Sequence, residues 1–176
     1  GLHLVGRYYH FRDGAPVMIL FHGYRGNGRR EFAGNNRIAE QLGFNVIAVD
    51  ERAHGKSGGH TITFGIKERY DCLTWANYAA DRFGCGTPII LAGVSMGAAT
   101  VMLASAEDLP DNVIGVLADC GYTSAREIIK KVIRDMRLPP RLLYPFVRLG
   151  ARLFGRFDLE ANSPIEAVQR ARVPLI

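Results

Sequence analysis

The chain has 176 residues, of which 48% are hydrophobic and 22% charged, and its net charge is +5 at pH 7. This composition is that of a globular protein with one domain and excludes a disordered chain. No apolar run is long enough to cross a membrane as a helix. The three cysteines, Cys72, Cys85 and Cys120, form no C-x-x-C pair. We therefore expect buried, reduced thiols, which indicate a cytoplasmic protein, and no metal site.

Strands and helices are expected to alternate along most of the chain. The predicted strands are 2–11, 17–21, 44–50, about 88–94 and 113–118, with a further one beginning at 173. The predicted helices are 30–42, 66–83, about 96–107 and 163–171. Continuous apolar runs suit strands that are buried on both faces. The alternation predicts an α/β fold with a mostly parallel sheet, helices on both faces, and functional groups at the carboxyl ends of the strands.

Residues 123–157 interrupt this alternation. Ser124 or Thr123 is expected to cap a helix that runs to about Met136, and the sequence Leu138-Pro139-Pro140 is expected to break it. Large apolar residues mixed with arginines then follow up to residue 157. We interpret 123–157 as a small helical insertion, or lid, over the functional edge of the sheet.

The sequence is organised around the motif Gly93-Val94-Ser95-Met96-Gly97. An apolar run of strand length precedes it and a run of small, helix-compatible residues follows it. In this context G-x-S-x-G is typical of a nucleophile elbow, in which a strained turn exposes the serine and the glycines let strand and helix approach. The N-terminus of the following helix favours negative charge beside the serine. The alternative is an ordinary Gly-Ser turn after a buried strand.

Four stretches together resemble the α/β-hydrolase superfamily, in particular its branch of Bem46-like and ABHD-type serine esterases. They are 21–27, 50–57, 93–97 and 119–124. The resemblance implies that Ser95 is the nucleophile and that the backbone N–H groups of Met96 and Tyr24 form the oxyanion hole. It implies hydrolysis of small-molecule carboxylic esters or thioesters through an acyl-enzyme, without a cofactor. A serine peptidase of the same superfamily is an alternative.

The family completes its catalytic triad with an acid and then a histidine, but no histidine follows Ser95 in this chain. We therefore expect 1–176 to be a single, incomplete hydrolase domain that lacks its C-terminal strands. The longer parent protein would be the enzyme, and the chain alone would be inactive. The alternative is a non-catalytic binding module on a hydrolase scaffold. Within the chain, His22 or His54 is an alternative base and Asp119 an alternative acid.

Two neighbouring groups are expected to be structural. Cys120, beside Asp119, is interpreted as a core thiol rather than a nucleophile. The polar stretch from Asp50 to Ser57 mixes charge types on one loop. It is interpreted as a hydrogen-bonded loop under the site rather than a metal site, because one histidine with one carboxylate is a weak ligand set.

Nine of the 22 basic residues lie in the segment 123–157, which therefore holds much of the positive excess. They are Arg126, Lys130, Lys131, Arg134, Arg137, Arg141, Arg148, Arg152 and Arg156. Three hypotheses remain: an amphipathic lid that contacts acyl chains or an anionic membrane surface, a region that steers an anionic substrate, or a solvated helix face over a buried stripe. No motif indicates nucleic acid. Missing strands would expose an apolar sheet edge, so self-association is also expected.

Overall fold

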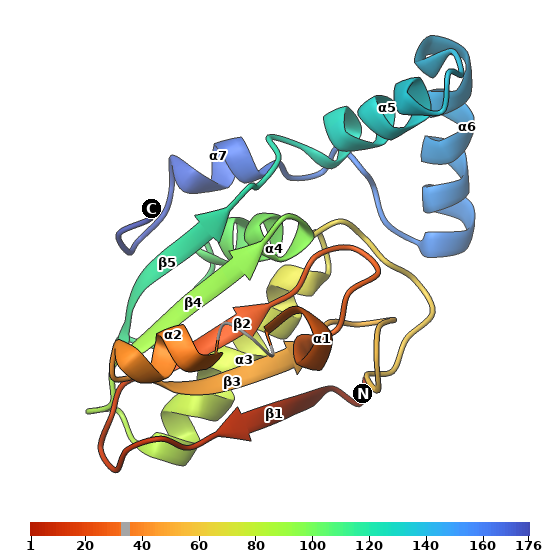
Figure 1. The fold of residues 1–176 in the computed structure, drawn as a ribbon. Helices are drawn as coiled ribbons and strands as arrows, with labels where there is room; N and C mark the ends of the chain where they lie inside the picture. Colours follow the sequence, from red (N-terminus) through yellow and green to blue (C-terminus); the bar gives the residue numbers. More distant parts are fainter. Residues whose placement is uncertain (33–35) are drawn as a thin grey trace.

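The computed structural model describes residues 1–32 and 36–176 (Figure 1). A five-stranded sheet with the strand order β1-β3-β2-β4-β5 forms its centre. The strands are β1 (Val5–Tyr9), β2 (Val17–Phe21), β3 (Asn45–Asp50), β4 (Ile89–Val94) and β5 (Val113–Asp119). β1 pairs antiparallel with β3, and the other neighbouring strands are parallel. The predicted α/β fold with a mostly parallel sheet is thus confirmed.

Helices cover both faces of the sheet, as predicted. The helices are α1 (Gly28–Phe32) and α2 (Asn36–Gln41) on one face, and α3 (Glu68–Phe83) and α4 (Met96–Ala104) on the other. Alternate residues of β2 point to opposite sides, so Ile19 packs with α3 and α4 whereas Leu20 packs with α1 and α2. Of the predicted helix 30–42, residues 33–35 lie outside the described residues.

The helical segment predicted over 123–157 is present. It consists of α5 (Ala125–Asp135), α6 (Pro140–Gly150) and a π-helical turn (Ala151–Gly155). Of the two candidate caps it is Ser124 that acts, because its hydroxyl accepts a hydrogen bond from the N–H of Glu127 at 3.1 Å. In Figure 1 the two helices lie beyond the carboxyl end of β5, away from the sheet. They pack with the loop at Ile66 through a separate apolar cluster.

The last residues return to the sheet. The short helix α7 (Pro164–Val168) is capped by Ser163, as the Ser-Pro pair predicted. Leu175 then forms a parallel bridge with Val116 of β5, and the N–H of Ile176 donates to the Val116 carbonyl at 3.0 Å. The strand predicted to begin at 173 therefore starts to pair along β5.

Candidate active site

Ser95 lies at the turn between β4 and α4 with a left-handed backbone, at φ 54° and ψ −106°. Such a conformation is costly for a residue other than glycine and is held only where the surroundings fix it. The N–H of Ser95 donates to the carbonyl of Asp119 at 2.8 Å, and its own carbonyl accepts from Ala99 at 3.2 Å. The strand, strained turn and helix that the motif predicted are therefore all present.

The two glycines of the motif are required by close backbone contacts. A Cβ atom on Gly93 would overlap the carbonyl of Gly97, and one on Gly97 would overlap the carbonyl of Phe21. Phe21 is the last residue of β2 and lies opposite Gly93 in the parallel ladder. Helix α4 thus packs directly on the backbone of two strands, with Ser95 at its N-terminus.

The loop after β2 passes beside Ser95. A Cβ atom on Gly23 would lie 3.5 Å from the Cβ of Ser95, and the N–H of Gly23 donates to Glu31 at 3.0 Å. The N–H of the next residue, Tyr24, has no acceptor among the described residues. Met96 opens α4, where N–H groups have no partner within the helix. The loop after β2 and the start of α4, which carry these two N–H groups, therefore meet at Ser95, at a helix N-terminus that favours negative charge.

His22 is buried directly below this loop. Its Nδ1 lies 2.7 Å from the carbonyl oxygen of Gly23, and its Nε2 accepts from the N–H of Glu51 at 3.0 Å. Burial is the main cause that lowers the pKa of His22, so the ring is neutral with Nδ1 as the donor. Both ring nitrogens are engaged with the backbone, and the ring ties the ends of β2 and β3 together.

His54 is engaged in the same way. Its Nδ1 lies 2.9 Å from the carbonyl of Arg52, and its Nε2 accepts from the N–H of Arg25 at 3.1 Å. The rings of His54 and His22 meet edge to face, with centroids 4.9 Å apart. Neither ring has a nitrogen left to take a proton from Ser95, so the structure argues against both as the base.

Asp119 and Cys120 lie where β5 leaves the sheet. Both side chains are exposed, and the Cys120 thiol donates to the Asp119 carboxylate at 3.1 Å. The expectation that Cys120 is a core thiol is therefore wrong, because the residue follows the strand rather than ending inside it. Cys85 is exposed as well, and Cys72 alone among the three is buried.

The loop after β3 is hydrogen-bonded, as its composition predicted. The Asp50 carboxylate accepts from the N–H groups of Gly28 and Lys56, both at 2.9 Å. The Arg52 guanidinium binds the carboxylate of Asp71 through two hydrogen bonds of 2.6 Å. Among the described residues, no group of three or more His, Cys, Asp or Glu is arranged to hold a metal ion.

The sequence did not reveal a buried polar group under α4. Glu51 is 4% exposed, and its Oε2 accepts from the Thr100 hydroxyl of α4 at 3.3 Å. Its Oε1 and the nearby Tyr122 hydroxyl are buried without a hydrogen-bond partner among the described residues. Burial, followed by the charge of Glu68, raises the pKa of Glu51 well above its usual range. A single acidic residue after a strand is normally solvated, so the sequence carried little signal for this burial.

Residues 16–162 match the family model described as the alpha/beta hydrolase fold. The chain belongs to this family. Its elbow, its mixed sheet and its helices on both faces are the corresponding features of this α/β hydrolase. Throughout 1–32 and 36–176, no helix is both long and apolar enough to span a membrane.

Two solved esterases and one curated protein are similar to this α/β hydrolase. The Pyrococcus furiosus esterase Pf2001 is 26% identical, with a TM-score of 0.72, over 99% of this chain and 64% of that one. Est1E from Butyrivibrio proteoclasticus, solved with ferulic acid bound, is 26% identical, with a TM-score of 0.59, over 67% and 49% of the two chains. The uncharacterized protein YqkD of Bacillus subtilis (strain 168) is 29% identical over 136 residues, 77% of this chain and 45% of YqkD. This chain therefore spans less than two thirds of each.

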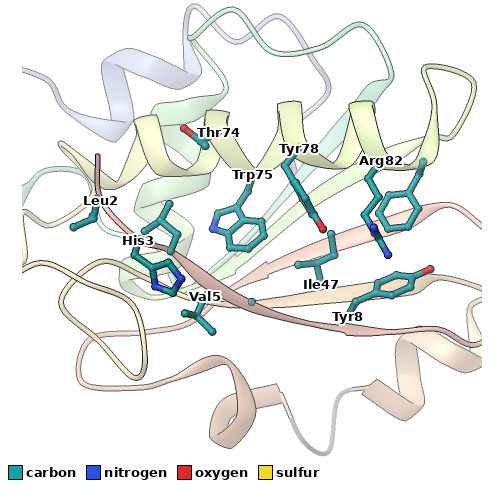
Figure 2. A pocket seen from close by; sticks show the side chains of 12 residues that line it. Leu2, His3, Val5, Tyr8, Ile47, Thr74, Trp75, Tyr78 and Arg82 are labelled. Atoms are coloured by element: carbon teal, nitrogen blue, oxygen red, sulfur yellow. The ribbon is translucent and has the colours of Figure 1, made fainter.

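A surface hollow lies between β1 and α3, away from Ser95. It has a volume of about 590 Å³, and Figure 2 shows Trp75 and Tyr78 of α3 facing Val5, Tyr8 and Ile47. Neither Ser95 nor another residue of its turn lines this hollow. The hollow is a gap beside the antiparallel edge strand of this α/β hydrolase and does not belong to the elbow.

Proposed function

We propose that this chain carries the nucleophile and oxyanion hole of a serine hydrolase that acts on carboxylic esters. The observation that carries the proposal is the strained Ser95 at the N-terminus of α4, with Gly23 of the loop after β2 beside it. The hydroxyl of Ser95 has no capping role, since it makes no hydrogen bond to the first turn of α4. Membership of the α/β-hydrolase family and similarity to two esterases support the same reaction class.

In this proposal Ser95 Oγ attacks the ester carbonyl carbon while a general base takes its proton. The carbonyl electron pair moves onto oxygen, where the N–H groups of Met96 and Tyr24 stabilise the negative charge. The C–O bond to the alcohol then breaks, and the alcohol leaves with the proton that the base held. Water hydrolyses the acyl-enzyme by the same steps and regenerates Ser95.

The general base is not assigned to a histidine of this chain. His22 and His54 are each engaged through both ring nitrogens. We assign the base to a residue outside 1–176, and the 64% coverage of the Pf2001 chain supports this assignment. Asp119 is the candidate acid within the chain, because it ends β5, the strand that pairs with β4 just before the Ser95 turn. The chain alone is accordingly expected to be inactive.

The segment 123–157 is proposed to shape the acyl side of the site. The Tyr24 ring is stacked on Phe64 with centroids 6.0 Å apart. Phe64 in turn lines an apolar cavity of about 310 Å³ between its loop and the helices α5 and α6. An apolar acyl group suits such walls better than a charged one.

The test uses the longer protein that contains this sequence. It is assayed with p-nitrophenyl acetate and butyrate and labelled with a fluorophosphonate, and Ser95→Ala is expected to lower turnover at least about a thousandfold and to abolish labelling. Cys85→Ala, at an exposed position in the turn between α3 and β4, is the matched control and is expected to keep full activity. Ester hydrolysis retained by Ser95→Ala would overturn the assignment. Parallel assays with a thioester and an anilide distinguish esterase, thioesterase and peptidase.

The second candidate is a non-catalytic binding module on the hydrolase scaffold. The engagement of both His22 and His54 with the backbone favours it. An unlabelled Ser95 in the longer protein, together with undetectable hydrolysis of all three substrate classes, would select this candidate. Stoichiometric labelling would exclude it, because a serine without a base reacts slowly.

A further inference from the structure

Helix α6 and the π-helical turn after it carry an exposed apolar stripe. Leu142, Phe146, Leu149 and Leu153 follow one another at the spacing of one helix face and are each 52–66% exposed. The opposite face of α6 packs on α5 through Tyr144, which is buried in a separate apolar cluster. Helix α6 therefore has two apolar faces, one packed against α5 and the other exposed to solvent.

The charge of this region is as uneven as its hydrophobicity. The segment 123–157 holds nine Lys or Arg against Glu127 and Asp135, a net charge of +7. The whole chain carries +5, so all the other residues together carry −2. The excess of positive charge thus belongs to the helical segment alone.

Some of the basic residues form ion pairs with nearby carboxylates, and others do not. Arg126, Arg148 and Arg152 pair with Asp158 or Glu160 just beyond the segment. Four arginines have no ion-pair partner among the described residues: Arg134, Arg137, Arg141 and Arg156. Arg137 and Arg141 flank the turn that leads into α6, next to Leu142 at the start of the stripe.

We propose that the outer face of α6, with the unpaired arginines beside it, is a docking surface for an anionic lipid membrane. The helix lies flat on the surface, with the stripe Leu142–Leu153 among the upper acyl chains and the guanidinium groups at the lipid phosphates. An apolar face bordered by basic residues is the pattern of interfacial helices, and each basic residue near an anionic surface adds to binding. Figure 1 shows α6 at the outside of the molecule, where a flat surface can reach it.

Charge distinguishes this partner from a second copy of the chain. Two copies joined through α6 would bring the unpaired arginines of both copies together, and like charges oppose such a contact. A soluble acyl chain would need a concavity, whereas these four residues stand on an outward helix face. An anionic bilayer can bury the exposed apolar stripe among its acyl chains and pair the excess positive charge with its phosphates.

The placement links membrane docking to the Ser95 site. The apolar cluster under α5 and α6 includes Phe64, and Phe64 stacks on Tyr24 of the loop beside Ser95. The docking surface itself does not depend on catalysis and goes beyond the proposed hydrolase activity.

Binding is measured by co-sedimentation of the protein with vesicles of phosphatidylcholine alone or with about 30% phosphatidylglycerol. Anionic vesicles are expected to bind the protein at least about tenfold more tightly, and salt at about 0.5 M is expected to remove most of this difference. Equal binding to both vesicles, or no binding to either, would overturn the proposal. So would sedimentation without vesicles, which indicates self-association.

Two variants with matched controls separate the apolar and the charged contributions. The apolar variant is Phe146→Ser/Leu149→Ser, and its control is Ile165→Ser on α7, where the side chain is 51% exposed. The apolar variant is expected to lose binding to anionic vesicles at least about tenfold, while its control binds like the wild type. An unchanged affinity of the stripe variant would contradict the proposal.

The charge variant is Arg137→Glu/Arg141→Glu, and its control is Arg170→Glu outside the segment. Each charge removed near the surface is expected to weaken binding about fivefold, so this variant loses binding more strongly than its control. All variants replace exposed side chains and are expected to melt like the wild type. Hydrolysis of soluble p-nitrophenyl acetate, measured without vesicles in the longer protein, reports on the proposed enzyme independently of docking.

Discussion

The carbonyl oxygen of Phe21 occupies the space where a side chain on Gly97 would lie. Phe21 ends β2, and Gly97 lies in the first turn of α4, so helix and strand touch through their backbones. Ser95 precedes this helix, in the turn after β4, with its left-handed backbone, while its hydroxyl makes no hydrogen bond to the first turn of α4. Packing rather than hydrogen bonding of the side chain therefore holds the serine in its strained conformation.

Replacing Gly97 by alanine is expected to destabilise the protein. The new methyl group must push α4 away from β2, and we expect the free energy of unfolding to fall by about 3 kcal/mol. Urea unfolding measures the change. Gly86→Ala is the control, because no atom lies within 4 Å of a Cβ there and its φ is not positive. Equal stability of the two variants would contradict the contact between Gly97 and Phe21.

The ion pair of Arg52 and Asp71 is expected to anchor the loop after β3 to α3. Both side chains are largely buried, at 17% and 13% exposure. Asp71→Asn is expected to lower the free energy of unfolding by about 2 kcal/mol, less than for a fully buried pair because some solvent remains. Arg52→Lys is expected to cost a similar amount, since lysine cannot form the two parallel hydrogen bonds.

A double-variant cycle tests the coupling between these two residues. Arg52→Met/Asp71→Leu is expected to be less destabilised than the sum of its single variants, because no uncompensated charge remains. Strictly additive effects in urea unfolding would show that the pair contributes nothing beyond its separate side chains.

Much of the fold could be predicted because its signals are local. The continuous apolar run of Val17–Phe21 marked β2 to the residue, since a strand covered on both faces needs apolar side chains throughout. Helix ends were less certain: α4 was expected to reach about 107 but ends at Ala104, where Ser105 bonds back to the carbonyl of Met102 at 2.7 Å.

The site was only partly predictable because several of its features depend on long-range packing. The Ser95 turn carries its own glycines and could be recognised from five residues. The burial of Glu51 depends on α4 and on Tyr122, which lie far along the chain. The hydrogen bonds of the two His22 ring nitrogens likewise depend on how the ends of β2 and β3 lie relative to each other, which the sequence does not supply.

Glu51 is expected to make stability fall as the pH rises. Its folded pKa lies well above its usual value of 4.5, so between these two values the unfolded chain releases a proton that the folded protein retains. The free energy of unfolding therefore decreases with pH across this window, by about 1.4 kcal/mol per unit of pKa difference. The groups whose charge reinforces the effect are Glu68, Asp71 and Glu31, and the Thr100 hydroxyl opposes it.

Glu51→Gln is expected to remove this pH dependence. The amide keeps an acceptor for Thr100 and never ionises, so the variant gains stability over the wild type at pH 8 but little at pH about 4. Thermal unfolding across this range measures the difference. Glu166→Gln, at an exposed position of α7, is the control and is expected to follow the wild type. Parallel pH profiles for Glu51→Gln and the wild type would refute the raised pKa.

Cys120 is expected to react slowly with thiol reagents although it is exposed. Its hydrogen bond to Asp119 is the main cause that raises its pKa, so less thiolate is present at pH 8. Asp119→Asn is expected to speed labelling of Cys120 by Ellman's reagent several-fold, with the exposed Cys85 as the internal reference. An unchanged ratio of the two rates would mean that the carboxylate does not hold the thiol proton.

Tyr122→Phe is expected to leave stability unchanged or to raise it. The Tyr122 hydroxyl is buried without a partner among the described residues, and burial, with the charge of Glu51 next, raises its pKa. Removing an unpaired buried hydroxyl relieves a desolvation cost, and we expect up to about 1 kcal/mol of added stability in urea unfolding. Tyr144→Phe is the comparison, because that hydroxyl donates to Glu160 at 3.2 Å and its loss is expected to cost about 1 kcal/mol. Both variants delete a tyrosine hydroxyl oxygen, so changes of opposite sign in the free energy of unfolding would follow from the presence or absence of a hydrogen-bond partner. A loss in Tyr122→Phe as large as in Tyr144→Phe would mean that the Tyr122 hydroxyl is paired after all, by a buried water molecule beside Glu51.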